Sequence, residues 1–175
     1  MRITALMENT APEGALRCEH GLALHIEHGG KRYLLDAGAT AARVHNAAAL
    51  GVEPGRIAKT LSFLVGERPI LIVAAGDTKI DNARYKARFG TKAKMLTPEQ
   101  AVELVGHAVG GVCPFAVNDG VEVYLDQSLK RFETVFPACG SSNSAIELTI
   151  SELEQYSRFD AWVDVCKGWR AEGEG

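Results

Sequence analysis

The chain has 175 residues, a length that fits one ordinary domain around a single core and excludes two full domains. Hydrophobic residues make up 46% and charged residues 23%, as in a globular protein, and the sequence has no run of 18 or more apolar residues to span a membrane. The net charge of −3 excludes a generally basic surface, so a footprint for nucleic acid would have to be local.

The N-terminal residues and the cysteines indicate the cellular compartment. Acidic Glu8 follows only a few apolar residues, which does not fit a secretory signal, and we therefore expect a cytoplasmic protein. The cysteines are scattered without a C-x-x-C pair, which predicts free thiols rather than a zinc site or a disulfide framework. They are Cys18, Cys113, Cys139 and Cys166.

The first third of the chain is predicted to be rich in strands. Short apolar runs predict strands at residues 2–6, 22–27 and 31–35. Gly29-Gly30 is expected to join the last two in a tight hairpin. The alanine-rich residues 40–50 favour a helix with Thr40 as N-cap, and Gly51 ends it.

The middle of the chain is predicted to supply the centre of a sheet and two helices. The apolar runs at 60–65 and 69–75 read as adjacent antiparallel strands. Residues 77–88 favour a helix with a basic surface. The sequence Thr97-Pro98-Glu99-Gln100 is a capping box with proline at the first helical position, and it predicts the start of a second helix.

The last third alternates loops and strands. Residues 106–115 contain three glycines and one proline and are expected to form a loop with unusual backbone angles. Ser151-x-x-Glu154 is expected to open a short helix, and the strands are predicted at 121–125, 132–137, 145–149 and 161–166. The predicted fold class is therefore α+β, a single domain with a mixed, mainly antiparallel sheet and flanking helices.

Three segments carry residues suited to ester chemistry: GRIAKTLSF (55–63), GHAVGGVCPF (106–115) and FPACGSSNSAIELT (136–149). Each is a weak signal alone, because a lysine such as Lys59 is most often a solvated charge and paired glycines most often form a turn. Together, backbone N–H groups at Gly-Gly and a nearby ammonium group can hold an anionic oxygen. The combination favours ester cleavage.

These segments, with ILIVAAGDTKID and WVDVCKGW, resemble the YbaK/ProX family, also called prolyl-tRNA synthetase-associated domains. The resemblance runs from about residue 47 to 169, some 70% of the chain, with the motifs in the family's order. It implies trans-editing: hydrolysis of the ester that links a wrong amino acid to tRNA, most often tRNA for proline. It implies no metal and no cofactor, mischarged tRNA as partner, and prolyl-tRNA synthetase as a further candidate partner.

The resemblance also implies site residues. The essential lysine of the family falls on Lys59 in KTL, and the substrate-binding glycine falls on Gly110 in VGG. The remaining substrate-binding positions are Gly111, Gly140, Ser141, Ser142 and Asn143. Family mechanisms rely on groups of the substrate to activate water.

The sequence itself offers no alternative catalytic group of comparable strength. It shows no defensible Ser/His/Asp arrangement, and His107 is expected to be a loop residue rather than a general base. Cys113 and Cys139 lack a recognisable histidine partner, which argues against a thiol nucleophile.

A basic strip supplies a local footprint for RNA. Its cations are Lys79, Arg84, Lys86, Arg88, Lys92 and Lys94, against one carboxylate at Asp81. Two interpretations stay open: a solvated helix face, or a surface that follows tRNA phosphates, in which case Lys79, Arg84, Lys86 and Arg88 are the tRNA-binding candidates. Tyr85 and Phe89 are expected in the core rather than as stacking platforms.

The first 50 residues resemble a different family, the opening strands of metallo-β-lactamase-fold hydrolases. The metal-binding H-x-H-x-D-H segment of that fold does not follow, and the five histidines lack its ligand spacing, so we expect no metal. The expected division is a β-rich segment at 1–39, an editing domain at 40–169 and a tail at 170–175. The strand at 31–35 is expected to replace the missing first strand of the editing-domain sheet. A non-catalytic tRNA-binding module, or an inert chimera, remains the alternative to an editing enzyme, and the oligomeric state stays open.

Overall fold

The fold is taken from a computed structural model, which describes residues 1–7, 23–35, 51–141 and 144–170. The predicted helix at residues 40–50 lies outside the described residues, as do Ser142 and Asn143.

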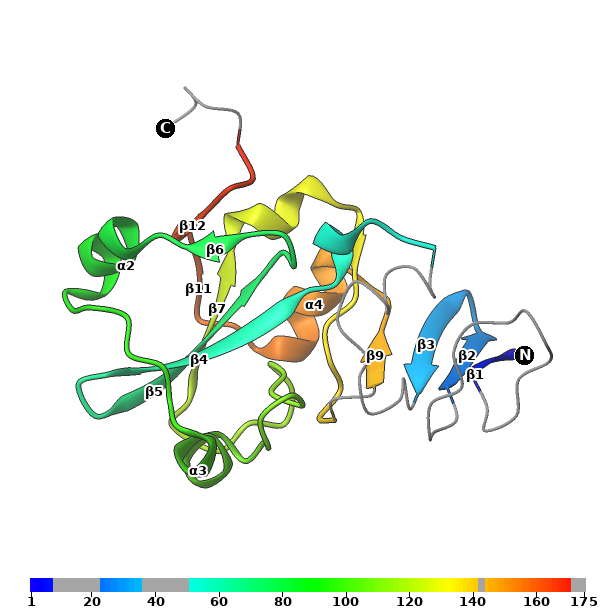
Figure 1. Cartoon of the computed structure of the whole chain (residues 1–175), viewed down its shortest axis with the longest axis horizontal. Helices are drawn as coiled ribbons and strands as arrows, with labels where there is room; N and C mark the ends of the chain where they lie inside the picture. Colours follow the sequence, from blue (N-terminus) through cyan, green and yellow to red (C-terminus); the bar gives the residue numbers. More distant parts are fainter. Residues whose placement is uncertain (8–22, 36–50, 142–143, 171–175) are drawn as a thin grey trace.

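The centre of the molecule is a four-stranded sheet with the order β11-β7-β5-β4 (Figure 1). Its strands are β4 (Lys59–Val65), β5 (Arg68–Ala74), β7 (Glu122–Asp126) and β11 (Ala161–Val163). As predicted, β4 and β5 form an antiparallel pair, whereas β7 runs parallel to β5 and β11 runs parallel to β7. Six of the eight strand pairings in the described chain are antiparallel, so the α+β class with a mainly antiparallel sheet is confirmed.

From Ile70 to Ala74, strand β5 is buried on both faces, which explains why this part of its sequence is uniformly apolar. Its alternate residues enter two hydrophobic cores, because side chains of a strand point to opposite faces in turn. One core includes Leu153 of α4 (Ile150–Ser157), and the other includes Tyr85 of α2 (Asn82–Phe89). Tyr85 is fully buried and its ring lies 4.8 Å from that of Phe89, which confirms the core assignment of this aromatic pair.

Helix α2 begins later than predicted, and the reason is a long-range strand pairing. Residues Lys79–Ile80 form β6, which pairs with β12 (Cys166–Lys167). Asp81 then caps the helix by accepting hydrogen bonds from the backbone N–H groups of Ala83 (2.9 Å) and Arg84 (3.1 Å). The predicted helix start at residue 77 is therefore wrong by five residues.

The two predicted capping boxes have different outcomes. Thr97 caps α3 (Pro98–Gln100), reciprocally with the side chain of Gln100, as expected. The box that opens α4 is not Ser151-x-x-Glu154 but Thr149-x-x-Glu152, whose side chains satisfy each other's backbone N–H groups.

Several predicted strands are shorter or divided. Residues 132–137 contribute only β8 (Thr134–Val135), and 145–149 divide into β9 (Ser144–Ile146) and β10 (Leu148–Thr149). The predicted strand at 161–166 is split into β11 and β12 because the N–H of Val165 turns to the buried carboxylate of Asp126 (2.9 Å). The remaining short helices are η1 (Pro54–Arg56), η2 (Ala101–Val105) and η3 (Gln127–Arg131).

A second sheet has the order β1-β2-β3-β9 and joins the N-terminal strands to the rest of the chain (Figure 1). Its N-terminal strands are β1 (Arg2–Met7), β2 (Ala23–His28) and β3 (Lys31–Leu35), and the predicted hairpin at Gly29-Gly30 is present. Strand β3 pairs with β9 of the predicted editing domain, as expected for a strand that joins this domain, but it does so in the second sheet and not in the central one. The outer edge of β4 is already occupied, since the N–H of Leu64 binds the carbonyl of Lys94 (2.9 Å).

A cluster around Glu147 connects the second sheet to the segments beside the central one. Its carboxylate accepts hydrogen bonds from Nε and Nη2 of Arg32 (both 2.6 Å), from Nη2 of Arg56 (2.9 Å) and from Oγ1 of Thr134 (2.8 Å). Both guanidinium groups also lie 5.3 Å from the ring centroid of Phe136. These donors, above all Arg32, lower the pKa of Glu147 to about 2.

We predict that Glu147→Gln destabilises the protein by about 1–3 kcal/mol at pH 7, because the charge-assisted hydrogen bonds no longer form. A carboxylate whose pKa is lowered by folding stabilises the fold at pH values above its unfolded-state pKa. This stabilisation is lost as the pH falls toward the folded-state pKa. The difference between the variant and the wild type should therefore shrink from about pH 4.5 to pH 2. Urea unfolding at several pH values in this range measures the difference in unfolding free energy. Glu133→Gln, at an exposed position, is the matched control. A constant difference over that range would contradict the ionic role.

Candidate functional site

A cavity of about 460 Å³ lies along β4 and the segments beside it. Four stretches of the chain line it: residues 57–62, the approach to α3, the glycine loop before β7, and the segment from Phe136 to β9. The lining residues after β4 are Met95, Leu96, Pro98, Val109, Gly110, Val112, Phe136, Ala138, Ser144 and Ala145. The structure thus brings together parts of all three segments that the sequence singled out.

Backbone hydrogen bonds fix the cavity walls. The N–H of Leu96 donates to the carbonyl of Ser62 (3.1 Å), which holds the approach to α3 beside β4. On the other side, the N–H of Ala58 donates to the carbonyl of Phe136 (3.1 Å) and the N–H of Phe136 to the carbonyl of Arg56 (2.7 Å). The walls therefore belong to the folded framework rather than to independent loops.

The two glycine-bearing loops touch through their backbones. A Cβ atom at Gly111 would lie 2.6 Å from the carbonyl oxygen of Gly140 and 2.8 Å from Cα of Ser141, so only glycine allows this approach. Gly110, which lines the cavity, has φ +94°, and Gly140 has φ +83°, as expected for a loop with unusual backbone angles. Ser141 is exposed, and its hydroxyl donates to that of Ser144 (2.8 Å).

Lys59 starts β4 and lines the cavity, but its side chain is not a solvated charge. The residue is only 8% exposed. Its ammonium group donates to the carbonyl of Thr78 and lies 3.5 Å from the carbonyl oxygen of Gly76. The interpretation of Lys59 as an ordinary surface lysine is therefore wrong, because backbone carbonyls beyond the end of β5 hold the ammonium group.

Thr60 is a cavity residue that was not predicted from the sequence. Its buried hydroxyl oxygen has no hydrogen-bond partner among the described residues. The side chain follows Lys59 directly in the KTL motif, and this adjacency is the only sequence signal that could have pointed to it.

His107 and Cys113 meet in space, contrary to the expectation that the cysteines have no histidine partner. The N–H of Cys113 donates to Nδ1 of His107 (3.4 Å), and its Sγ lies 3.9 Å from the same nitrogen. Burial raises the pKa of the Cys113 thiol. The pKa of Cys139 is raised to about 11, mainly by desolvation of its sulfur, although the residue as a whole is exposed. Both thiols are therefore protonated at neutral pH and poor nucleophiles.

The basic strip is divided between two elements. Lys79 lies on β6 and is exposed, as is Lys86 on α2. Arg84 forms an ion pair with Asp164 (3.0 Å), and the guanidinium group of Arg88 lies 5.2 Å from the ring centroid of Phe89. Arg84 is therefore ion-paired, whereas Lys79 and Lys86 are exposed, and the strip does not lie on a single helix face.

The described ranges contain no group of three or more His, Cys, Asp or Glu residues placed to hold a metal ion. Nor do they contain a helix that is long and apolar enough to cross a bilayer.

Comparison with known proteins agrees with the fold. Residues 38–156, well over half of the chain, match the family model described as the aminoacyl-tRNA editing domain. The chain belongs to this family. A solved structure described as a candidate trans-editing enzyme for prolyl-tRNA synthetase superposes with a TM-score of 0.70 and 29% identity, over 80% of this chain and 88% of that one.

Sequence relatives include free-standing proteins and parts of larger enzymes. The uncharacterized protein YwhH of Bacillus subtilis is 60% identical over 121 residues, 69% of this chain and 77% of that protein. EbsC of Enterococcus faecalis, named as a candidate Cys-tRNA(Pro)/Cys-tRNA(Cys) deacylase, is 30% identical over 58% of this chain and 63% of its own length. Proline–tRNA ligase of Lactiplantibacillus plantarum is 26% identical over 66% of this chain, which spans only 20% of the ligase. None of these similarities supports the metallo-β-lactamase resemblance of the first 50 residues.

We predict that Gly111→Ala separates the two glycine-bearing loops, because its Cβ would collide with the backbone at Gly140. Neither colliding group is a flexible side chain, so the variant should lower the melting temperature and the ester-cleaving activity together. Gly120→Ala is the control, since its φ of +84° carries backbone strain of about 1–2 kcal/mol without any neighbour within 4 Å. Equal effects of the two substitutions on activity would show that the loop contact is unimportant.

Proposed function

We propose that the chain hydrolyses the ester bond of mischarged aminoacyl-tRNA, with tRNA for proline as the substrate. The observation that carries the proposal is the cavity, in which the KTL strand, the glycine loop and the segment after Phe136 meet in a chain of the aminoacyl-tRNA editing family. The names of EbsC and of the candidate trans-editing enzyme support the choice of tRNA.

In this proposal the backbone of Gly110 binds the substrate near the reacting carbonyl. Its positive φ and its place in the cavity lining favour a main-chain contact, as a side chain would occupy the space of the substrate. The wall behind Gly110 is formed by Gly111, Gly140 and Ser141. The same substrate-binding loop also includes Ser142 and Asn143.

Lys59 supplies positive charge at the start of β4, where it anchors the terminal nucleotide. Its ammonium group is held by the carbonyl of Thr78, so the charge is preorganised rather than free to move.

Water is activated by the substrate rather than by a side chain of the protein. The described lining of the cavity holds no carboxylate or imidazole that could act as general base. Water attacks the ester carbonyl carbon, the bond to the ribose oxygen breaks, and that oxygen receives the proton. A hydroxyl of the terminal ribose relays the proton, and free amino acid and tRNA leave.

The organisation around this activity is also part of the proposal. The editing domain spans residues 40–169, preceded by the β-rich segment at 1–39. It works in the cytoplasm without a metal, and prolyl-tRNA synthetase is a partner. Lys79, Arg84, Lys86 and Arg88 contribute to tRNA binding.

We predict that Lys59→Ala lowers deacylation of mischarged tRNA by about 100-fold or more, as expected when a preorganised electrostatic interaction is removed. Because Lys59 is buried and hydrogen-bonded, the variant should also be somewhat less stable, so rates are compared well below its melting temperature. Exposed Lys92→Ala is the control and should keep the wild-type rate. Wild-type turnover by folded Lys59→Ala would refute the assigned role.

Metal chelators are expected to leave the deacylation rate and the melting temperature unchanged, since the described residues provide no ligand cluster. Elemental analysis of the purified protein provides the independent measurement. Stoichiometric zinc, or a rate that falls with chelator and returns with metal, would contradict the metal-independent mechanism.

A further inference from the structure

A groove of about 490 Å³ lies at the end of the central sheet where β5 and β7 finish. Helix η3 and the residues after β11 line it: Gln127, Lys130, Arg131, Asp164, Trp169 and Arg170. Three of the six side chains are cations, and only one is a carboxylate. The groove lies outside the cavity described above, and no sequence motif predicted it.

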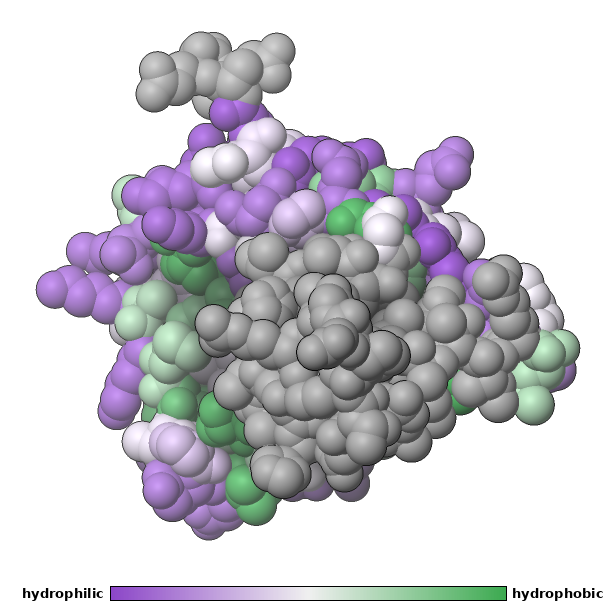
Figure 2. Space-filling view, turned by 45° about the vertical axis from the view of Figure 1, so that its right-hand side comes forward, coloured by the Kyte–Doolittle hydropathy of each residue, from purple (hydrophilic) through white to green (hydrophobic). Residues whose placement is uncertain are grey.

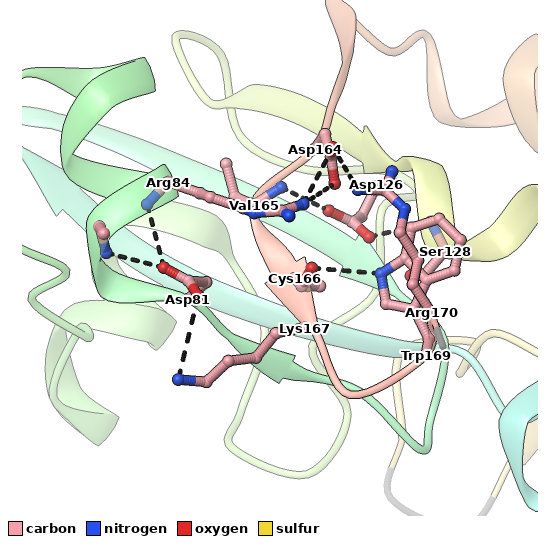
Figure 3. Close-up of polar contacts among 11 residues, drawn as sticks. Asp81, Arg84, Asp126, Ser128, Asp164, Val165, Cys166, Lys167, Trp169 and Arg170 are labelled. Atoms are coloured by element: carbon pink, nitrogen blue, oxygen red, sulfur yellow. Dashed lines mark hydrogen bonds and ion pairs between the residues drawn. The ribbon is translucent and has the colours of Figure 1, made fainter. Parts of the chain in front are cut away.

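The groove is continuous with the predicted basic strip. The carboxylate of Asp164 pairs with Arg84 of helix α2 (3.0 Å) and with Arg170 of the groove (2.9 Å), as Figure 3 shows. In addition, Lys167 of β12 lies opposite Lys79 of β6 in the pairing of these two strands. Cations from distant parts of the sequence therefore share one surface.

We call this surface the cationic face and define it by six residues. They are Lys79, Arg84, Lys130, Arg131, Lys167 and Arg170. Three carboxylates lie among them, Asp77, Asp81 and Asp164, which leaves a net charge of +3 in a chain whose total is −3. Figure 2 shows mainly hydrophilic residues in the upper part of the molecule, at the level of β6 and β12, and both apolar and hydrophilic residues lower down.

The ion pairs on this face leave the cations available to a ligand. The side chain of Asp164 is 38% exposed and that of Arg84 is 35% exposed. Exposed pairs of this kind contribute at most about 1 kcal/mol, so the phosphates of a polyanion can compete for the same guanidinium groups. Lys130 is exposed, and its ammonium group lies 4.1 Å from the ring centroid of Trp162.

The indole of Trp169 organises the groove. Its Nε1 donates to the carbonyl of Cys166 (3.1 Å), which fixes the ring. The guanidinium carbons of Arg170 and Arg131 lie 4.2 Å and 5.6 Å from the ring centroid. Contact with an aromatic ring limits the freedom of these long side chains and lowers the entropic cost of binding an anion.

One short turn separates the cationic face from the cavity. Arg131 of the groove binds both carboxylate oxygens of Asp77 (2.6 and 3.0 Å). On the same turn, the carbonyls of Gly76 and Thr78 face the ammonium group of Lys59. A ligand that lies along the groove can therefore extend over residues 76–78 toward Lys59.

We propose that the cationic face docks the sugar–phosphate backbone at the acceptor end of tRNA, so that the terminal nucleotides cross the 76–78 turn to the cavity. The inference rests on the proposed function for the identity of the RNA. The surface has the features expected of RNA backbone recognition: extended positive charge, guanidinium groups for phosphate, and a path to the reactive end. The proposal gives binding roles to Lys130, Arg131, Lys167 and Arg170, which the basic strip alone did not include.

The test measures binding of a fluorescent RNA hairpin that reproduces an acceptor stem with its single-stranded 3′ end. The double variant Lys130→Glu with Arg170→Glu should weaken binding about tenfold or more, and should reduce the salt slope by about 1 for each phosphate that the protein no longer binds. Lys130→Gln with Arg170→Gln is the second variant, in case charge reversal impairs folding, and it should show the same reduction in slope. Circular dichroism and the melting temperature establish that each variant is folded.

The matched control reverses two exposed cations at the opposite end of the central sheet, Arg68→Glu at the start of β5 with Arg158→Glu at the end of α4, beside the start of β7. This end of β5 lies about 20 Å from the 76–78 turn, given about 3.3 Å per strand residue. The control carries the same change in total charge as the test variant. It should bind the hairpin with an unchanged salt slope.

The outcomes separate this inference from the proposed function. Because the hairpin carries no amino acid, binding is measured whether or not the wild type deacylates any substrate. Equal affinity and salt slope in the folded test variants and the wild type would overturn the docking surface, even if deacylation is intact. Equal weakening by the test and control variants would also overturn it, since only general charge attraction would then be at work. If the test variants bind the hairpin more weakly than the wild type but the wild type does not deacylate any substrate, the proposed hydrolysis is refuted and the RNA-binding surface is supported.

Discussion

The carboxylate of Glu147 is the contact on which the arrangement of the cavity depends most directly. It lies between β9 and β10 and binds Arg32 of β3, Arg56 of η1 and Thr134 of β8. Arg56 in turn binds Phe136 through its backbone carbonyl, and Phe136 binds Ala58 just before Lys59. One charged side chain therefore fixes the N-terminal sheet, the start of β4 and the wall opposite it. The N-terminal strands are part of this network because β3 supplies both Arg32 and the pairing partner of β9.

Close backbone approach and burial, rather than a set of reactive side chains, define the chemistry of the cavity. Gly111 touches the backbone of Gly140 so closely that a Cβ atom on Gly111 would not fit, and Gly110 lines the cavity. Lys59 holds its charge against backbone carbonyls, and the neighbouring thiols of Cys113 and Cys139 have raised pKa values. These properties suit a site that orients an ester and its water, and they do not suit covalent catalysis.

The buried carboxylate of Asp126 connects the central sheet to the cationic face. It ends β7 and accepts hydrogen bonds from the backbone N–H groups of Ser128 (3.0 Å) and Val165 (2.9 Å). The first bond starts η3, which carries Lys130 and Arg131, and the second directs the chain between β11 and β12 toward Trp169 and Arg170. The position of the cations on this face therefore follows from one buried carboxylate whose hydrogen bonds to water are replaced in the fold by bonds to two backbone N–H groups.

The sequence by itself determined the local features of this protein. The β4–β5 pair, the hairpin at Gly29-Gly30 and the capping box at Thr97 each depend on residues close together in the chain, and each is present. The segments of the cavity could also be named, because their motifs are contiguous. Only the tertiary structure decided how distant residues meet. The pairing of β6 with β12 set the start of α2, the neighbours of Glu147 placed β3 beside β9, and Asp164 joined Arg84 to Arg170. These contacts join residues far apart in the chain, and their free energies depend on geometry that no local pattern encodes. For the same reason, the contact of His107 with Cys113 and the burial of Lys59 became evident only from the fold.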